Sequence, residues 1–166
     1  MHRPRPGRLA DFPYVGKHHY SLRFATLARR RVFESAAVAS AAIAQIQQTC
    51  AEEDFAILAH CVMPDHVHLV LEGLCDTSDL RRCVKLTKQR VEYAARKQFG
   101  VHALWQVGYY ERILRSHHAL ETAIRYVLDN PVRAGLVKRA EDYPFSGSSR
   151  SRLAQTFEMR VRETIE

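Results

Sequence analysis

Alternating apolar and polar positions predict three strands in the first half of the chain. Residues 19–25 place their apolar side chains on one parity, with Tyr20, Leu22 and Phe24, as in a strand with one buried face. Residues 54–63 form a mostly apolar run, and residues 66–72 alternate cleanly. Because Pro64-Asp65 between them is a turn sequence, the second and third strands are predicted to form a hairpin.

Three longer segments have the character of helices. Residues 32–52 are rich in alanine and contain neither Gly nor Pro. Residues 79–99 carry an apolar stripe and end at Gly100, a frequent C-terminal stop. A third helix is predicted over residues 119–129, with Asn130-Pro131 expected to end it. Between the second and third helices, residues 103–115 are predicted to be extended and to contain a strand.

The order of these elements predicts an α+β fold with a ferredoxin-like βαββαβ core, an antiparallel sheet with helices on one face. The helix over 119–129 is added C-terminally to that core. A length of 166 residues suits one domain, predicted here to span residues 18–148. Residues 1–17, rich in Arg and Pro, are expected to form a loosely docked basic arm. Residues from Glu141 onward are expected to be loop, and 149–166 to form a tail that becomes helical after Ser151.

Composition favours a cytosolic protein. The hydrophobic fraction of 46% is ordinary for a globular chain, and no apolar run is long enough to span a bilayer. The basic start has no apolar stretch behind it, so no signal peptide is expected. The cysteines at positions 50, 61, 75 and 83 lack metal-site spacing. They are expected to be reduced and mostly buried.

The distribution of charge points to a polyanionic partner. The net charge is +7, yet no Lys or Arg lies between Val32 and Ser78, where seven acidic residues do. The basic residues are therefore concentrated elsewhere, which favours a basic face that binds nucleic acid. The residues expected to contact DNA phosphates lie along the second helix and in the N-terminal arm: Arg81, Lys85, Lys88, Arg3, Arg5 and Arg8.

Two short stretches carry candidate chemistry. His66 and His68 lie two apart on a predicted strand, so both imidazoles share a face and offer two ligands for one divalent metal ion. Alone, such a pair more often decorates a solvent face. In the predicted third helix Tyr126 and Asn130 lie one turn apart, although a helical tyrosine usually packs its ring and Asn before Pro commonly ends a helix.

Together the two stretches resemble the single-tyrosine HUH transposases. The motif Met63-Pro64-Asp65-His66-Val67-His68 is followed about 60 residues later by Tyr126-Val127-Leu128-Asp129-Asn130-Pro131-Val132-Arg133-Ala134-Gly135-Leu136-Val137. Within that group the chain is most similar to the bacterial REP-associated tyrosine transposases, relatives of the single-strand insertion-sequence transposases. The resemblance extends from about Tyr20 to Ser148 and includes Leu104-Trp105-Gln106, Tyr109-Tyr110, Arg115 and Tyr143-Pro144-Phe145-Ser146.

The resemblance implies a metal-dependent DNA nicking and joining enzyme. His66 and His68 would hold Mg²⁺ or Mn²⁺, with Asn130 as a third ligand and Asp129 as its alternative. Tyr126 would attack hairpin-forming single-stranded DNA and form a 5′-phosphotyrosine. The sequence departs from the family at Asp65, where many relatives have Asn, and at Leu128-Asp129, which replaces a frequent His-Leu.

Other interpretations stay open at this point. The same fold could serve a DNA-binding protein that has lost catalysis, or a metal-dependent phosphodiesterase that uses water and leaves Tyr126 structural. Aromatic residues that could stack on single-stranded bases are Trp105, Tyr109 and Tyr110, although Trp105 is equally suited to the core. Neither a monomer nor a homodimer is favoured, so the tyrosine could act in its own chain or in a partner.

Overall fold

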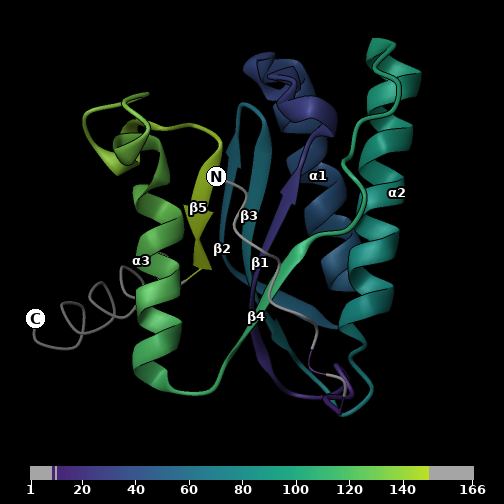
Figure 1. Ribbon diagram of the computed structural model, residues 1–166, viewed down its shortest axis with the longest axis vertical. Coiled ribbons are helices and arrows are strands. Elements are labelled where there is room, and N and C mark those ends of the chain that lie inside the picture. Colours follow the sequence, from purple (N-terminus) through teal and green to yellow (C-terminus); the bar gives the residue numbers. More distant parts are fainter. Residues whose placement is uncertain (1–8, 10, 150–166) are drawn as a thin grey trace, which may run out of the picture.

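The computed structural model describes residues 9 and 11–149 of the chain. Its strands form one antiparallel sheet in the order β4-β1-β3-β2-β5. The strands are β1 (His19–Ala25), β2 (Phe55–Met63), β3 (His66–Gly73), β4 (Tyr110–Leu114) and β5 (Ser146–Ser148). The α-helices are α1 (Ala36–Glu52), α2 (Leu80–Phe99) and α3 (His117–Arg133), as shown in Figure 1.

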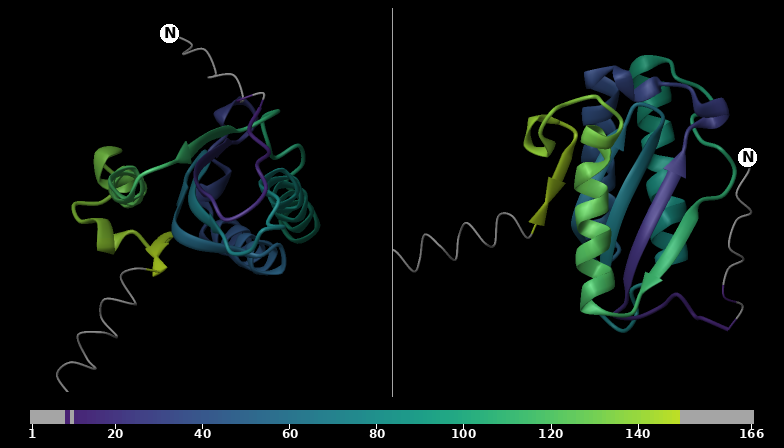
Figure 2. Two further views of the ribbon diagram at one scale, coloured as in Figure 1. Left: turned by 90° about the horizontal axis from the view of Figure 1, so that it is seen from below. Right: turned by 60° about the vertical axis from the view of Figure 1, so that its left-hand side comes forward.

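The predicted ferredoxin-like core is confirmed. β1, α1, β2, β3, α2 and β4 follow one another along the chain, and the four strands lie in the order β4-β1-β3-β2. α1 and α2 cover one face of the sheet, and α3 packs on the opposite face, so the sheet lies between two helical layers (Figure 2). The hairpin of β2 and β3 turns at Pro64-Asp65 as expected.

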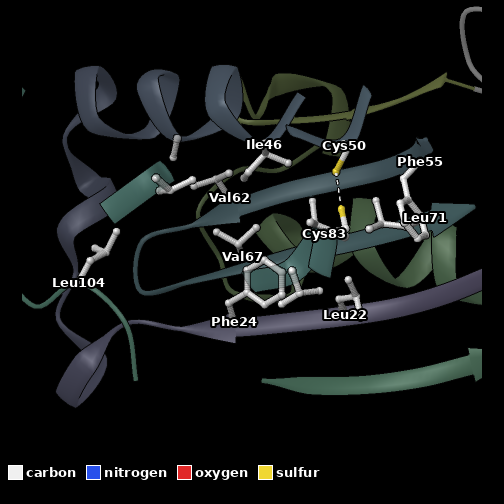
Figure 3. Close-up of a cluster of buried hydrophobic side chains, with 14 of the residues drawn as sticks. Leu22, Phe24, Ile46, Cys50, Phe55, Val62, Val67, Leu71, Cys83 and Leu104 are labelled. Carbon is white, nitrogen blue, oxygen red and sulfur yellow. Dashed lines mark hydrogen bonds between the residues drawn. The ribbon is translucent and has the colours of Figure 1, made fainter. Parts of the chain in front are cut away.

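The main core lies between the sheet and the pair α1 and α2. Leu22 and Phe24 of β1 meet Val67, Leu69 and Leu71 of β3 there, all essentially inaccessible to solvent (Figure 3). These positions share one parity on each strand, so the opposite parity faces α3. Full burial of each such side chain stabilises the fold by about 1.5–3 kcal/mol. Burial on this scale fixes the register, and with it the residues that face α3.

Three helix ends follow local capping chemistry. α1 begins at Ala36, four residues later than predicted, because the Ser35 side chain accepts a hydrogen bond from the Val38 N–H and acts as the N-cap. Residues 32–34 before it form a separate 3₁₀ turn. α2 has the predicted bounds: Asp79 caps its start, and Gly100 ends it in the left-handed conformation with φ of 68°.

The predicted end of the third helix is wrong. α3 runs on through Asn130 and Pro131 to Arg133. Pro131 is buried on the same face as Val127, so tertiary packing outweighs the lost backbone donor. The helix stops instead at Gly135, whose φ is 72°. There the N–H groups of Gly135 and Leu136 donate back to Val132 and Pro131, a Schellman ending.

The segment after Glu141 contains a strand that the sequence did not predict. β5 pairs with β2 through His60 and Gly147, so it extends the sheet at the β2 edge. Its residues are Ser-Gly-Ser, which have low strand propensity; backbone pairing with β2 and a hydrogen bond from Oγ of Ser148 to the Leu58 carbonyl over 2.8 Å hold it in place. A Cβ at position 147 would lie 2.9 Å from Cε1 of His60, so any larger residue would force the imidazole to shift, and glycine lets the strand cross it as it stands.

The N-terminal boundary also differs from the prediction. Residues 11–17 belong to the folded domain: Tyr14 is 2% exposed, and its carbonyl accepts from the Leu80 N–H. Residues 1–8 and 10 of the predicted arm, and residues 150–166 of the predicted tail, lie outside the described residues. In the described part of the chain no helix combines the length and apolar character needed to cross a membrane.

Candidate active site

The two histidines lie at the start of β3, on the face of the sheet that carries α3. Strand alternation turns Val67 and Leu69 into the main core and leaves His66 and His68 on the other side. Their Nε2 atoms are 3.1 Å apart, and the two rings meet edge to face. The pair therefore presents two ring nitrogens to one point.

This spacing fits a shared metal ion. Two ligands with metal–nitrogen bonds of about 2.0–2.1 Å lie about 3.0–3.4 Å apart, depending on whether the geometry is octahedral or tetrahedral. The separation of 3.1 Å lies within that range. Among the described residues, no group of three His, Cys, Asp or Glu side chains could hold a metal ion. The histidines therefore offer two ligands, and Asp129 is not brought to them as a third.

Burial keeps both imidazoles neutral. Burial first, and then the charges of the neighbouring His66 and Arg23, lower the pKa of His68 to about 3. The pKa of His66 is also lowered, first by burial, although the hydrogen bond with Asp65 opposes the shift. A neutral imidazole keeps a lone pair for a metal ion. At neutral pH, therefore, neither histidine has to lose a proton before it can bind one.

Asp65 orients His66 from the hairpin turn. Nδ1 of His66 donates to Oδ1 of Asp65 over 2.6 Å, which leaves Nε2 of His66 as the nitrogen with the lone pair. The other carboxylate oxygen pairs with Nε of Arg29 at 2.9 Å. Burial would raise the pKa of Asp65, but the bond from His66 and the charge of Arg29 outweigh it, and the pKa is lowered. The acid is thus ionised where it orients the ligand.

Tyr126 lies beside the histidines because of how α3 packs. Leu120, Ile124, Val127 and Pro131 form the buried stripe of α3, at intervals of three or four residues. Tyr126 is on the flank of that stripe, 46% exposed. Its ring centroid is 5.9 Å from that of His68, and the rings meet edge to face. The phenol ring and the histidine pair thus lie side by side within a single chain.

Arg133 also contacts the tyrosine ring. Two turns after Tyr126 on α3, its guanidinium carbon lies 4.4 Å from the ring centroid, close enough for a cation–π interaction. Asn130, the predicted third ligand, lies between them in sequence, and its side-chain Nδ2 donates to the Tyr126 carbonyl over 2.9 Å. Asn130 is therefore held on the helix by a local bond, and the structure records no contact between it and the histidines.

The comparisons with known proteins identify the family. Residues 14–130 match the family model described as IS200-like transposases. The chain belongs to this family. A REP-associated tyrosine transposase of Escherichia coli is 31% identical over 102 residues, which cover 57% of this chain and 55% of the relative. A Haemophilus influenzae protein of the same description is 24% identical over 123 residues, 67% of this chain and 69% of that protein.

The solved structures agree with this transposase in fold. The structure of a REP-associated tyrosine transposase bound to a REP hairpin matches it with a TM-score of 0.70. That match covers 88% of this chain and 82% of the other, at 21% sequence identity. The resemblance stated from the sequence is thus confirmed for the family and for the fold.

The predicted DNA-binding residues of the transposase are not gathered at this site. Arg81, Lys85 and Lys88 lie on α2, which packs on the sheet face opposite the histidines. Lys88 is half-buried, and its Nζ donates to the carbonyls of Gln106 and Gly108. It therefore anchors the segment before β4. Arg3, Arg5 and Arg8 lie outside the described residues.

Three arginines near the site were not singled out from the sequence. Arg23 of β1 lies directly opposite His68 in the sheet register, Arg29 pairs with Asp65, and Arg133 covers Tyr126. Strand parity alone showed that Arg23 faces away from Leu22 and Phe24, but not which strand lies beside it. The three cations surround the histidine pair, so the site attracts an anion.

The candidate stacking residues are divided between the two faces. Trp105 is half-buried against Phe24 and Phe33, and its Nε1 donates to the Lys88 carbonyl. Tyr109 packs edge to face on Phe24 in the same core. Tyr110 is 39% exposed and shares a cross-strand row with Arg23. Of the three, only Tyr110 is available beside the histidines.

Proposed function

We propose that this transposase nicks and rejoins hairpin-forming single-stranded DNA through a covalent bond to Tyr126, with a divalent metal ion at His66 and His68. The observation that carries the proposal is the edge-to-face approach of Tyr126 to His68 within one chain. A phenol beside a metal-binding histidine pair, in a cationic setting, suits attack on a phosphodiester. The solved relative bound to a REP hairpin supports a hairpin-forming DNA substrate.

The reaction is an exchange of phosphoester bonds. The oxygen of Tyr126 forms a bond to phosphorus while the bond from phosphorus to the 3′ oxygen breaks. The phenolic proton leaves to solvent, to which Tyr126 is open, and the departing 3′ oxygen takes up a proton to become a hydroxyl. The product is a 5′-phosphotyrosine. A second 3′ hydroxyl can reverse the exchange and join strands without an external energy source, because the number of phosphoester bonds is conserved.

Each neighbouring residue has a role in this exchange. His66 and His68 would hold Mg²⁺ or Mn²⁺, which when bound polarises the scissile phosphate and offsets charge in the transition state. Asp65 accepts from Nδ1 of His66 and would thereby keep the lone pair of Nε2 available to such an ion. Arg133, whose guanidinium lies over the ring, restrains the tyrosine. Asn130 stays the candidate for a third ligand, through its amide oxygen.

The experiment that tests the proposal seeks a denaturation-resistant protein–DNA adduct. Labelled hairpin DNA from the flanks of the gene, with its single-stranded ends retained, is incubated with the protein and Mg²⁺ or Mn²⁺. We expect an adduct with the wild type and metal, and none with Tyr126→Phe or with the double variant His66→Ala/His68→Ala. Tyr126→Phe keeps the ring and should still bind DNA.

Two other outcomes would replace the proposal. Cleavage without an adduct, retained in Tyr126→Phe, would indicate a phosphodiesterase that uses water. Binding without cleavage across several flank sequences would indicate a DNA-binding protein that has lost catalysis. The adduct itself separates the proposed reaction from both alternatives, and chelation tests its dependence on metal, since the adduct should disappear with EDTA and return with added Mn²⁺.

A further inference from the structure

The face of the sheet that carries α3 is only half covered by it. α3 packs over β2 and β3, where it contacts Leu58, Cys61 and Val70. Seen from the α3 side, β1 and β4 lie beside the helix, and in the described part of the chain no helix crosses them on this face (Figure 2, right). An open strip of sheet therefore borders the histidine pair.

The sheet register defines which residues form this strip. Tyr110 of β4 pairs with Arg23 of β1, and Arg23 pairs in turn with His68 of β3. In the next row Arg112 pairs with Ser21. With neighbouring strands about 4.8 Å apart, Tyr110 lies about 10 Å from His68 across the sheet. Together, Tyr110, Arg112, Ser21 and Arg23 form the open strip.

The chemistry of the open strip fits single-stranded nucleic acid. Tyr110, Arg112 and Arg23 are all exposed, so one ring and two guanidinium groups face solvent in adjacent positions. Bases stack on aromatic side chains whatever their sequence, and cations follow the phosphates. The acidic residue of β1, β3 and β4 on this face is Glu72, which lies two rows from His68 and pairs with His19 at 3.4 Å.

We infer that the open strip binds the unpaired DNA next to the scissile phosphate, with a base stacked on Tyr110 and phosphates at Arg23 and Arg112. The inference rests on the proposed function, because the strip gains its meaning from a scissile phosphate held at His68 and Tyr126. The single-stranded flank then lies on this face, and α2, on the opposite face, does not bind it.

The test measures DNA binding by fluorescence anisotropy, with Tyr126→Phe in every protein so that no cleavage occurs. The probes are the flanked hairpin described above and the same hairpin with both single-stranded flanks removed. Tyr110→Leu should raise Kd for the flanked hairpin about 5- to 100-fold, while Tyr110→Phe should stay within about twofold. Neither variant should change binding of the trimmed hairpin.

Matched controls lie on α2. Tyr93, also on a solvent face at 53% exposure, provides Tyr93→Leu as the control for loss of an aromatic ring. Lys85→Gln matches Arg112→Gln as the loss of one exposed cation. We expect both α2 variants to bind the flanked hairpin like the parent, and Arg112→Gln to reduce the salt dependence by about one phosphate contact.

The outcomes separate the strip from the reaction. Unchanged binding in Tyr110→Leu, an equal loss with the trimmed hairpin, or an equal loss in Tyr93→Leu and Lys85→Gln would overturn the inference. If the wild type forms no adduct yet the Tyr110 pattern holds, the proposed reaction fails and the binding strip stands. If the adduct forms while Tyr110→Leu binds normally, only the strip is wrong.

Discussion

Replacement of Asp65 tests how the proposed metal site is built. Asp65 has one carboxylate oxygen on Nδ1 of His66 at 2.6 Å and the other on Nε of Arg29 at 2.9 Å. Asp65→Leu removes both contacts at similar volume and leaves the ring of His66 free to turn or to move its proton to Nε2. Asp65→Asn keeps an oxygen acceptor for His66 but loses the charge.

The size of the effect follows from the bond that is lost. Removal of an outer hydrogen-bond partner of a ligating histidine typically weakens metal binding by about 10- to 100-fold, or about 1.4 to 2.7 kcal/mol. We expect Asp65→Leu near the upper figure, because nothing replaces the acceptor. We expect Asp65→Asn at or below the lower one, because a neutral hydrogen bond has roughly half the strength of a charge-assisted one.

The assay is Mn²⁺ binding to the protein alone, by isothermal titration and by the loss of the free Mn²⁺ signal in electron paramagnetic resonance. Arg29→Gln is the matched control, since it breaks the ion pair and keeps the bond to His66. Arg29 is half exposed, so its pair contributes little, and we expect less than about a threefold change. Wild-type Mn²⁺ affinity in Asp65→Leu would refute the argument that Asp65 orients a metal ligand.

Three further predictions concern whether Tyr126 acts within its own chain, which cysteine reacts with alkylating reagents, and how α3 packs on the sheet. Because Tyr126 reaches His68 within one chain, an equal mixture of Tyr126→Phe and His66→Ala/His68→Ala proteins should form no adduct; restored adduct in that mixture would show that the tyrosine serves a partner. Cys75 is partly exposed and its pKa is lowered by hydrogen bonds with Ser78 and Thr77, whereas the other three cysteines are buried. Iodoacetamide should therefore label one site in the native protein at neutral pH, and mass spectrometry that finds several would contradict this packing. Val127→Ala, at a fully buried contact of α3 with the sheet, should destabilise the fold by about 2 kcal/mol, measured by urea denaturation, and a change below about 0.5 kcal/mol would count against the packing of α3.

Much of the fold could be predicted because burial imposes regular patterns on strands. Alternation in β1 and β3 identified Leu22, Phe24 and Val67 as core, and Gly100 marked the end of α2. The end of α3 could not be predicted from Pro131, because the preference of proline for helix ends is weaker than the burial of that ring against the sheet. The Gly135 in the same segment was the better signal.

The short strand β5 escaped prediction for a different reason. Ser146, Gly147 and Ser148 have no apolar alternation, and their pairing depends on the edge that β2 leaves open. Gly147 is explained by its cross-strand partner His60, whose imidazole would meet a side chain at this position. Such a strand is a property of the assembled sheet and leaves little trace in its own sequence.

The candidate site could likewise be predicted only in part from the sequence. The shared face of His66 and His68 follows from strand parity alone, whereas Tyr126 was assigned through resemblance to a family and lies beside them in the structure. Arg23 and Arg133 were missed because their importance depends on sheet register and on how α3 is laid across it. The basic residues of α2 were conspicuous in the sequence, yet this helix packs on the sheet face opposite the histidines.

The most direct measurement of the central claim is the identity of the residue bound to DNA. The protein is incubated with the flanked hairpin and Mn²⁺, the covalent product is digested with nuclease and trypsin, and the modified peptide is sequenced by tandem mass spectrometry. The account predicts a nucleotide linked through its 5′ phosphate to Tyr126. Linkage to another residue such as Tyr110, or cleaved DNA with no modified peptide, would contradict it.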